Sequence, residues 1–351
     1  MLLPIHTNGR RLRVRGRARR RLVAAVLLVI ASSRSEAADS WEERFDAEEA
    51  AVNAACARVG KPAYPAADGP SEGESRALGT ECDSEALYYG IGRPADPVAA
   101  RKCAFIELRK DELVLGGSTM LMMLYANGRG VVQDLELAVA IACGTDAAPA
   151  ERVGRVKHLL NMKAGKDAGV FDICDDITSG LMMGYCAGLH ERIDAVARNR
   201  RLDTVVAKLP IVARPAFAKL KAAADAYFEA RESNEVDLSG TARAALVIEE
   251  GARLREAFVS SVEALVASPP RWRFAEADYR VADRALNEAY RRAIRAEALG
   301  TVTPDGIRRT QRAWLSYRDA WAVFGRALHP DVPAVGWKTW ITRERTGMLA
   351  E

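Results

Sequence analysis

From residue 170 onward, hydrophobic and polar positions follow the 3.6-residue period of a helix. These helical patterns cover residues 193–201, 214–231, 241–266, 274–299 and 305–328. Pro and Gly clusters at residues 268–270 and 300–304 interrupt them, and Ser239, Thr241 and Thr303 are suitable helix caps. Alternating β-branched runs, which would predict strands, are absent from the sequence. The pattern therefore predicts an all-α fold.

Two segments of the N-terminal half repeat one pattern at an offset of 38 residues. The first copy has Gly90, Gly92, Asp96 and Ala100, and the second has Gly128, Gly130, Asp134 and Ala138. Glycine permits the positive φ of a tight turn, aspartate caps the next helix, and alanine lets a neighbouring helix approach. The pattern predicts two helix–turn–helix units and resembles Sel-like repeats, which are relatives of the tetratricopeptide repeat.

The segment before the repeats divides into a helix and a loop. Residues 40–58 are acidic and rich in alanine, which favours a helix, whereas residues 60–73 are rich in Pro, Gly and Ser, which favours a linker. We therefore expect residues 38–80 to form an N-terminal helix and linker, and residues 81–165 to hold the two Sel-like repeats.

The first 37 residues have the pattern of an export signal. Eight arginines between positions 10 and 21 precede an uncharged apolar run over residues 22–31, and Ser35, Glu36 and Ala37 resemble a cleavage site. As a helix, that run rises only about 15 Å, half the thickness of a bilayer core, so we expect no membrane span. The predicted mature protein begins after Ala37 and is periplasmic or secreted, and soluble.

The distribution of charge argues against a nucleic-acid partner. The whole chain has a formal charge of +4, but residues 1–37 contain nine Arg and one Glu, so the remainder carries −4. Nucleic-acid binding depends on a basic surface, and the predicted mature chain has no overall excess of basic residues.

Six cysteines follow the predicted signal, and an even number in an exported protein favours disulfides. None forms a C-x-x-C pair and the histidines lie apart from them, so we expect no metal site. Cys103 and Cys143 follow the equivalent aspartates of the two repeats by seven and nine residues. We expect these two to pair across stacked repeats.

Three motifs near the C-terminus place aromatic and polar residues on shared helical faces. The first contains Asp283, Leu286, Asn287 and Tyr290, the second Gln311, Trp314, Tyr317, Arg318 and Asp319, and the third Thr342, Arg345 and Leu349. Such faces predict an α-helical bundle with an aromatic core. In this order the motifs resemble the lysozyme inhibitor LprI-like family of exported bacterial proteins, although Trp321 stands where that family often has a cysteine.

The resemblance implies that residues 170–351 form an LprI-like helical domain. It also implies a disulfide between Cys174 and Cys186, because the family opens with two cysteines twelve positions apart. Together with the pairing expected for Cys103 and Cys143, this bond leaves Cys56 to pair with Cys82. Tyr227 and Arg231 parallel Trp314 and Arg318 at an offset of 87, which suggests two diverged modules. The implied partner is a protein of the envelope, with lysozyme the leading candidate.

The motif residues have two interpretations. Leu286, Tyr290, Trp314 and Tyr317 are expected to pack in the core, with a ligand platform as the alternative. Asp283, Arg318 and Arg345 are expected to be buried charge partners, because a buried charge without a partner is costly, with partner recognition as the alternative.

Sequence motifs for catalysis are missing. The chain has no H-E-x-x-H, G-x-S-x-G or Walker motif. Residues 90–95 satisfy the letters of a dinucleotide fingerprint, but the preceding segment is helical instead of a β-strand. We therefore expect a binding protein that is not an enzyme and needs no cofactor. A cell-envelope hydrolase with an unrecognised site is the alternative.

Overall fold

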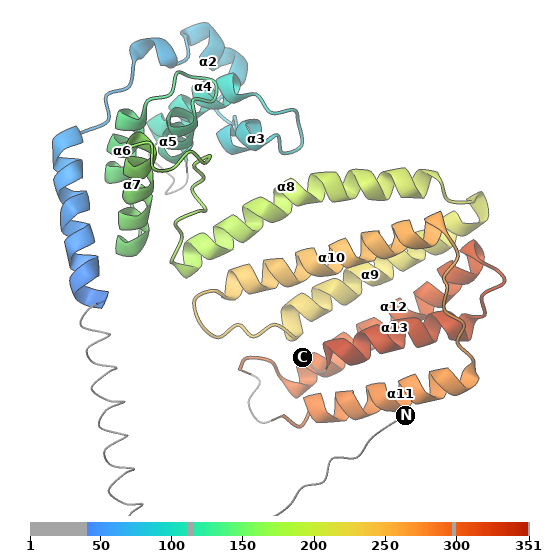
Figure 1. The fold of residues 1–351 in the computed structure, drawn as a ribbon. Coiled ribbons are helices and arrows are strands. Elements are labelled where there is room, and N and C mark those ends of the chain that lie inside the picture. Colours follow the sequence, from blue (N-terminus) through green and yellow to red (C-terminus); the bar gives the residue numbers. More distant parts are fainter. Residues whose placement is uncertain (1–40, 111–115, 297–299, 350–351) are drawn as a thin grey trace, which may run out of the picture. The chain divides into compact units, whose positions relative to one another are not determined.

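Helices are the only regular elements in the residues that the structure, a computed structural model, describes, which are 41–110, 116–296 and 300–349 (Figure 1). This confirms the predicted all-α fold. The predicted signal, residues 1–37, lies outside the described residues. The chain divides into two compact units at Gly60; the structure describes residues 41–60 of the first, and the second begins at Lys61. In the first unit the structure describes a helix over residues 41–59, where Trp41 stacks on Phe45.

Short helices open the second unit. They are η1 (Ala66–Asp68), α2 (Glu72–Leu78), α3 (Ser84–Tyr89), α4 (Pro97–Glu107), η2 (Leu108–Lys110), α5 (Gly117–Asn127), α6 (Leu135–Gly144) and α7 (Pro149–Lys163). From α3 to α7, each α-helix packs against the next one in the chain. This is the arrangement of consecutive helical hairpins.

The two copies of the sequence repeat have the same turn geometry. Gly90 and Gly128 end α3 and α5 in the left-handed conformation, with φ of 76° and 62°. Asp96 caps α4, and Asp134 caps α6 in the same way, each by accepting a hydrogen bond from a backbone N–H three residues later. Ala100, at the equivalent position to Ala138, is fully buried, as is Ala138. The sequence pattern therefore marks one structural unit twice.

The expected pairings of Cys103 with Cys143 and of Cys56 with Cys82 are wrong. Cys103 is bonded to Cys82, and their Cα atoms lie 5.8 Å apart. Relative to the repeat, Cys103 and Cys143 differ by two positions, which turns their side chains by roughly 200° around equivalent helices. Cys103 therefore faces the segment before α3. Cys56 and Cys143 are disulfide-bonded as well.

Longer helices make up the rest of the second unit. They are α8 (Gly180–Ala207), the short η3 (Ile211–Ala213), α9 (Arg214–Asn234), α10 (Arg243–Ala267), α11 (Glu276–Ala293), α12 (Pro304–Leu328) and α13 (Ala334–Met348). Helix α10 packs along α8, α9 packs along α12, and α13 contacts both α11 and α12. Aromatic side chains from α9, α10, α12 and α13 fill the core between them.

A loop is fastened to the start of α8. Ser179 caps this helix, since its hydroxyl accepts a hydrogen bond from the N–H of Met182 at 3.3 Å. The preceding loop folds back so that Cys174 bonds Cys186, with their Cα atoms 5.8 Å apart. This is the pairing that the family resemblance implies. Among the described residues, no helix is long and apolar enough to cross a membrane.

Candidate functional site

Arg345 lies in the last turn of α13, buried in the C-terminal bundle. Its side chain is fully buried, and its two terminal nitrogens donate hydrogen bonds of 2.8 and 2.5 Å to the carboxylate of Glu235, which follows α9. Its Nε donates to the side chain of Gln311 on α12 at 3.1 Å. Burial acts to lower the pKa of Arg345, but the bonds to Glu235 outweigh it and the pKa is raised. One motif residue therefore joins three helical segments.

The ion pair continues into a buried network. Arg231 donates to Glu235 at 2.9 Å and also pairs with Glu250 on α10. We call Arg231, Glu235, Glu250 and Arg345 the Arg345 network. Two guanidinium groups face two carboxylates there, as buried charges require, and the half-exposed Arg253 also bonds Glu250.

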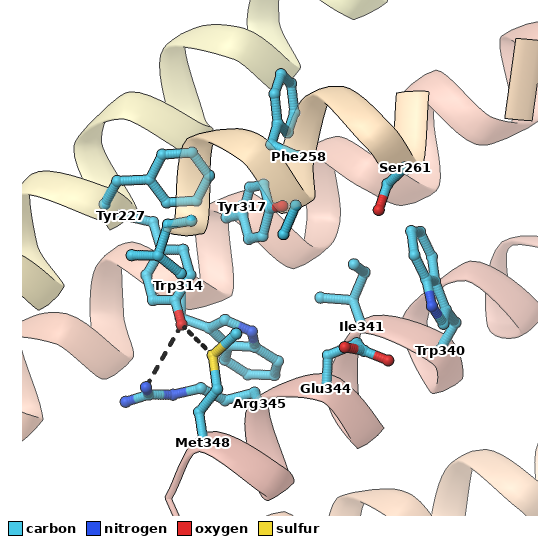
Figure 2. Close-up of a pocket in the computed structure, with 13 residues that line it drawn as sticks. Tyr227, Phe258, Ser261, Trp314, Tyr317, Trp340, Ile341, Glu344, Arg345 and Met348 are labelled. Carbon is cyan, nitrogen blue, oxygen red and sulfur yellow. Dashed lines mark hydrogen bonds between the residues drawn. The ribbon is translucent and has the colours of Figure 1, made fainter. Parts of the chain in front are cut away.

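A pocket opens beside the Arg345 network (Figure 2). Its cavity volume is about 60 Å³, and it is lined by side chains of α9, α10, α12 and α13. The lining residues are Tyr227, Phe228, Leu254, Ala257, Phe258, Ser261, Trp314, Tyr317, Trp340, Ile341, Glu344, Arg345 and Met348. Figure 2 shows the hydroxyl of Tyr227 between Arg345 and the sulfur of Met348, at 3.4 and 3.3 Å.

The chemistry of this pocket suits an apolar group. Tyr317 is buried, and burial raises the pKa of its phenol, so the group stays neutral at ordinary pH. The rings of Tyr227 and Tyr317 stack 5.2 Å apart. The pocket lining contains no histidine or cysteine. Its volume accommodates a small apolar side chain or a few water molecules.

A second polar cluster ties α11, α12 and α13 together through the middle motif. Arg318 donates to Asp319 at 3.0 Å and to the hydroxyl of Tyr279 on α11 at 3.2 Å. Lys338 on α13 pairs with Asp319 at 3.2 Å. The guanidinium of Arg318 also lies 5.4 Å from the centre of the Trp314 ring. The expected charge partner of Arg318 is thus its neighbour in sequence.

The remaining motif residues divide into buried and exposed groups. Leu286 and Thr342 are buried, and Leu349 packs against the core. Asn287 is exposed and donates to the backbone and carboxylate oxygens of Asp283, one turn earlier on α11, at 2.8 and 3.1 Å. Tyr290 is half-buried on the same helix. Packing explains the buried group but leaves the Asp283–Asn287 pair without a role in the core.

The acidic partners of Arg345 were not predictable from the motifs. Glu235 and Glu250 lie on segments far from α13 in the chain, so no local pattern connects them to it. One local signal was available, because Glu235 stands four residues after Arg231, the helical spacing of an ion pair. In the described residues, no group of His, Cys, Asp and Glu is arranged to hold a metal ion.

These three helices and their motifs have a counterpart among known families. Residues 272–346 match the family model of the lysozyme inhibitor LprI. The LprI segment, as we call these residues, contains α11, α12 and nearly all of α13, and it includes every motif residue except Leu349. The disulfide between Cys174 and Cys186 lies outside it. No curated protein and no solved structure matches the chain.

Proposed function

We propose that this chain is an exported protein-binding module of the bacterial cell envelope and that it inhibits lysozyme. The observation that carries the proposal is the match of the LprI segment to a family of lysozyme inhibitors. In its support, the segment's motif residues hold α11, α12 and α13 together through Arg318 and anchor α13 to α9 through Arg345. A binding role without catalysis also fits the pocket, whose lining is mostly apolar.

The proposed organisation has four parts. Residues 1–37 are a leader that is removed, 38–80 a helix and linker, 81–165 two Sel-like repeats, and 170–351 an LprI-like domain. The shared turn geometry of the two repeat copies supports the repeat segment, residues 81–165, which would offer a further protein-binding surface. Disulfide bonding of all six cysteines suits an oxidising compartment such as the periplasm.

Charge is unevenly divided between the parts. The LprI segment holds 14 Lys and Arg against nine Asp and Glu, a formal charge of +5. Residues 38–271 hold 28 Lys and Arg against 36 Asp and Glu, a formal charge of −8. Many lysozymes are strongly basic, so long-range attraction would come from residues 38–271 and not from the LprI segment. We therefore propose that the acidic part speeds the encounter while the LprI segment supplies specific contacts.

The Asp283–Asn287 pair on α11 is the proposed contact within the LprI segment. Both belong to the first motif, and their hydrogen bonds join residues of the same helix. Motif residues that do not serve packing are candidates for recognition. The half-buried carboxylate of Asp283 and the exposed amide of Asn287 also suit a basic protein surface, which offers donors from Arg and Lys.

Lysis of bacterial cells by lysozyme tests this proposal. Purified mature protein, residues 38–351, is added in rising amounts at about 20 mM and about 150 mM salt. Lysis should slow as the protein approaches lysozyme in concentration, and more protein should be needed at the higher salt. The double variant Asp283→Ala/Asn287→Ala should require about tenfold more protein for the same inhibition, if the pair is a hot spot.

A matched control is Asp305→Ala, which removes an exposed carboxylate on α12 of the LprI segment that pairs locally with Arg308. This variant should inhibit like the wild type. Undiminished lysis at a large molar excess of wild-type protein would rule inhibition out. In that case a pull-down from periplasmic extract still tests the broader claim of protein binding.

A further inference from the structure

A second pocket lies outside the LprI segment, where the N-terminal ends of α5, α7 and α8 come together. Its cavity volume is about 360 Å³, several times that of the pocket beside the Arg345 network. Polar lining comes from Thr119, Asp146, Glu151, Arg155 and Ser179. Apolar lining comes from Ile173, Leu181 and Met182. Neither the sequence motifs nor the proposed inhibitor function gives this pocket a role.

Arg155 is the unusual member of the lining. The residue is only 2% exposed, yet its Nε and Nη1 atoms are buried and make no hydrogen bond within the described part of the chain. Burial lowers the pKa of its guanidinium, while the nearby carboxylates of Glu151 and Asp176 act in the opposite direction. Buried donors without acceptors are costly, and they are rare in folded proteins.

The two nearby carboxylates are engaged elsewhere. One oxygen of Glu151 accepts hydrogen bonds from the backbone N–H groups of Thr178 and Ser179 at 2.9 and 2.6 Å. An oxygen of Asp176 lies 2.9 Å from Nδ1 of His158. The negative charges of Glu151 and Asp176 therefore favour the charged form of the Arg155 guanidinium. The carboxylate oxygens named here, however, already interact with other groups. Nε and Nη1 of the guanidinium therefore have no acceptor among the described residues.

The rest of the lining defines the size and charge of that acceptor. Ile173 and Met182 are buried and give the pocket an apolar wall, and Leu181 is 70% exposed at its rim. Asp146 is exposed and negative, and because it repels each negative charge of a ligand, it disfavours a dianion more than a monoanion. We propose that this pocket binds a small monocarboxylate with a short aliphatic body, whose carboxylate accepts hydrogen bonds from Arg155.

Calorimetric titration of mature protein with hexanoate tests the site, with hexanamide as the neutral probe of the same shape. Hexanoate should bind saturably with a dissociation constant of about 1 mM or lower. Hexanamide should bind at least about tenfold more weakly, because it lacks the charge that strengthens bonds from a guanidinium. Equal affinity for the two probes, or no saturable heat with hexanoate, would overturn the proposal.

Variants assign the binding to Arg155. Arg155→Met should lose roughly tenfold or more in hexanoate affinity, as expected for removal of a hydrogen bond to a charged group. Arg152→Met is the matched control, because Arg152 lies on the same helix but does not line the pocket. It should bind hexanoate like the wild type. Unchanged affinity in Arg155→Met would contradict the site.

Circular dichroism reports whether Arg155→Met folds. If it does not fold, a variant at an exposed position still tests the site. Leu181→Glu places a negative charge at the rim without disturbing the core, because Leu181 is largely exposed. It should weaken hexanoate several-fold, and Leu181→Gln should not. Equal hexanoate affinity in Leu181→Glu and Leu181→Gln would show that hexanoate binds elsewhere and would refute this site. The proposed lysozyme inhibition is independent of either outcome.

Discussion

Arg345 is held in the core by one carboxylate, that of Glu235, whose side chain is 6% exposed. In Arg345→Met this carboxylate loses its bidentate partner and keeps only Arg231. Breaking a buried pair from one side typically costs 3–5 kcal/mol, so we expect a loss of about that size in the free energy of unfolding. Urea denaturation measures it.

The control for this prediction is Arg308→Ala on α12. Arg308 pairs with Asp305 in an exposed position, where ion pairs contribute about 1 kcal/mol or less. A small effect of Arg345→Met, within the range of Arg308→Ala, would mean that the Arg345 network does not stabilise the bundle.

Glu250 makes the stability of the same network depend on pH. Burial acts to raise the pKa of Glu250, but hydrogen bonds from Arg253 and Arg231 outweigh it, and the pKa is lowered. A carboxylate whose pKa is lower in the folded state stabilises the protein above its unfolded pKa of about 4.3 and loses this effect as pH falls through the folded value. The urea concentration at the unfolding midpoint should therefore decrease as the pH falls below about 4.3. The decrease should be less steep in Glu250→Gln. Equal pH dependence in both proteins would contradict this role.

The sequence indicated which charged residues need a partner in the core better than it indicated which residues those partners are. The need for a charge partner at Arg345 followed from its place among apolar residues of one helical face. The identity of that partner did not, because Glu235 reaches Arg345 only after α9 and α13 have packed. The partner of Arg318, by contrast, is adjacent in sequence.

Among the elements, the contact between α12 and α13 depends on a glycine. A Cβ atom at Gly325 would lie 2.2 Å from the ring of Trp337, which is fully buried. Gly325→Ala should therefore separate the two helices and cost about 1–3 kcal/mol of unfolding free energy, as overpacking does. Thermal and urea unfolding both report this loss.

Gly347→Ala is the matched control on α13. Nothing lies within 4 Å of a Cβ atom at that position, and alanine is the better helix former. Its stability should be unchanged or higher by about 0.5 kcal/mol. If Gly325→Ala were as stable as Gly347→Ala, this would contradict the close contact between Gly325 on α12 and the ring of Trp337.

Caps and breakers predicted the start of α12 but not that of α10, whose N-cap is Ala242 and neither Ser239 nor Thr241. Thr303 caps α12 and Pro304 begins it, as the sequence indicates. The prediction for α8 covered only residues 193–201 of a helix that begins at Gly180. Glycines weaken the helical pattern in its first half, and one of them, Gly184, is needed because a Cβ atom there would lie 2.8 Å from Ala244 on α10. That requirement comes from packing and is invisible in the local sequence.

For the whole molecule, the disulfides show what repeat symmetry can and cannot predict. The two repeat copies share turns and caps, but Cys103 and Cys143 occupy different positions in them, so symmetry does not bring them together. The charge of −4 on the predicted mature chain likewise conceals two parts of opposite sign. The net charge of the whole chain therefore does not describe the charge of the surface that contacts a partner.

The central claim is that the mature protein binds lysozyme, and calorimetric titration of the two proteins tests it most directly. At about 50 mM salt we expect saturable heat with a dissociation constant of roughly 1 μM or tighter, since a functional inhibitor must bind in that range. Affinity should decrease at about 200 mM salt, because attraction by the acidic residues 38–271 is screened. A titration without binding heat at several temperatures, together with undiminished lysis, would contradict the account.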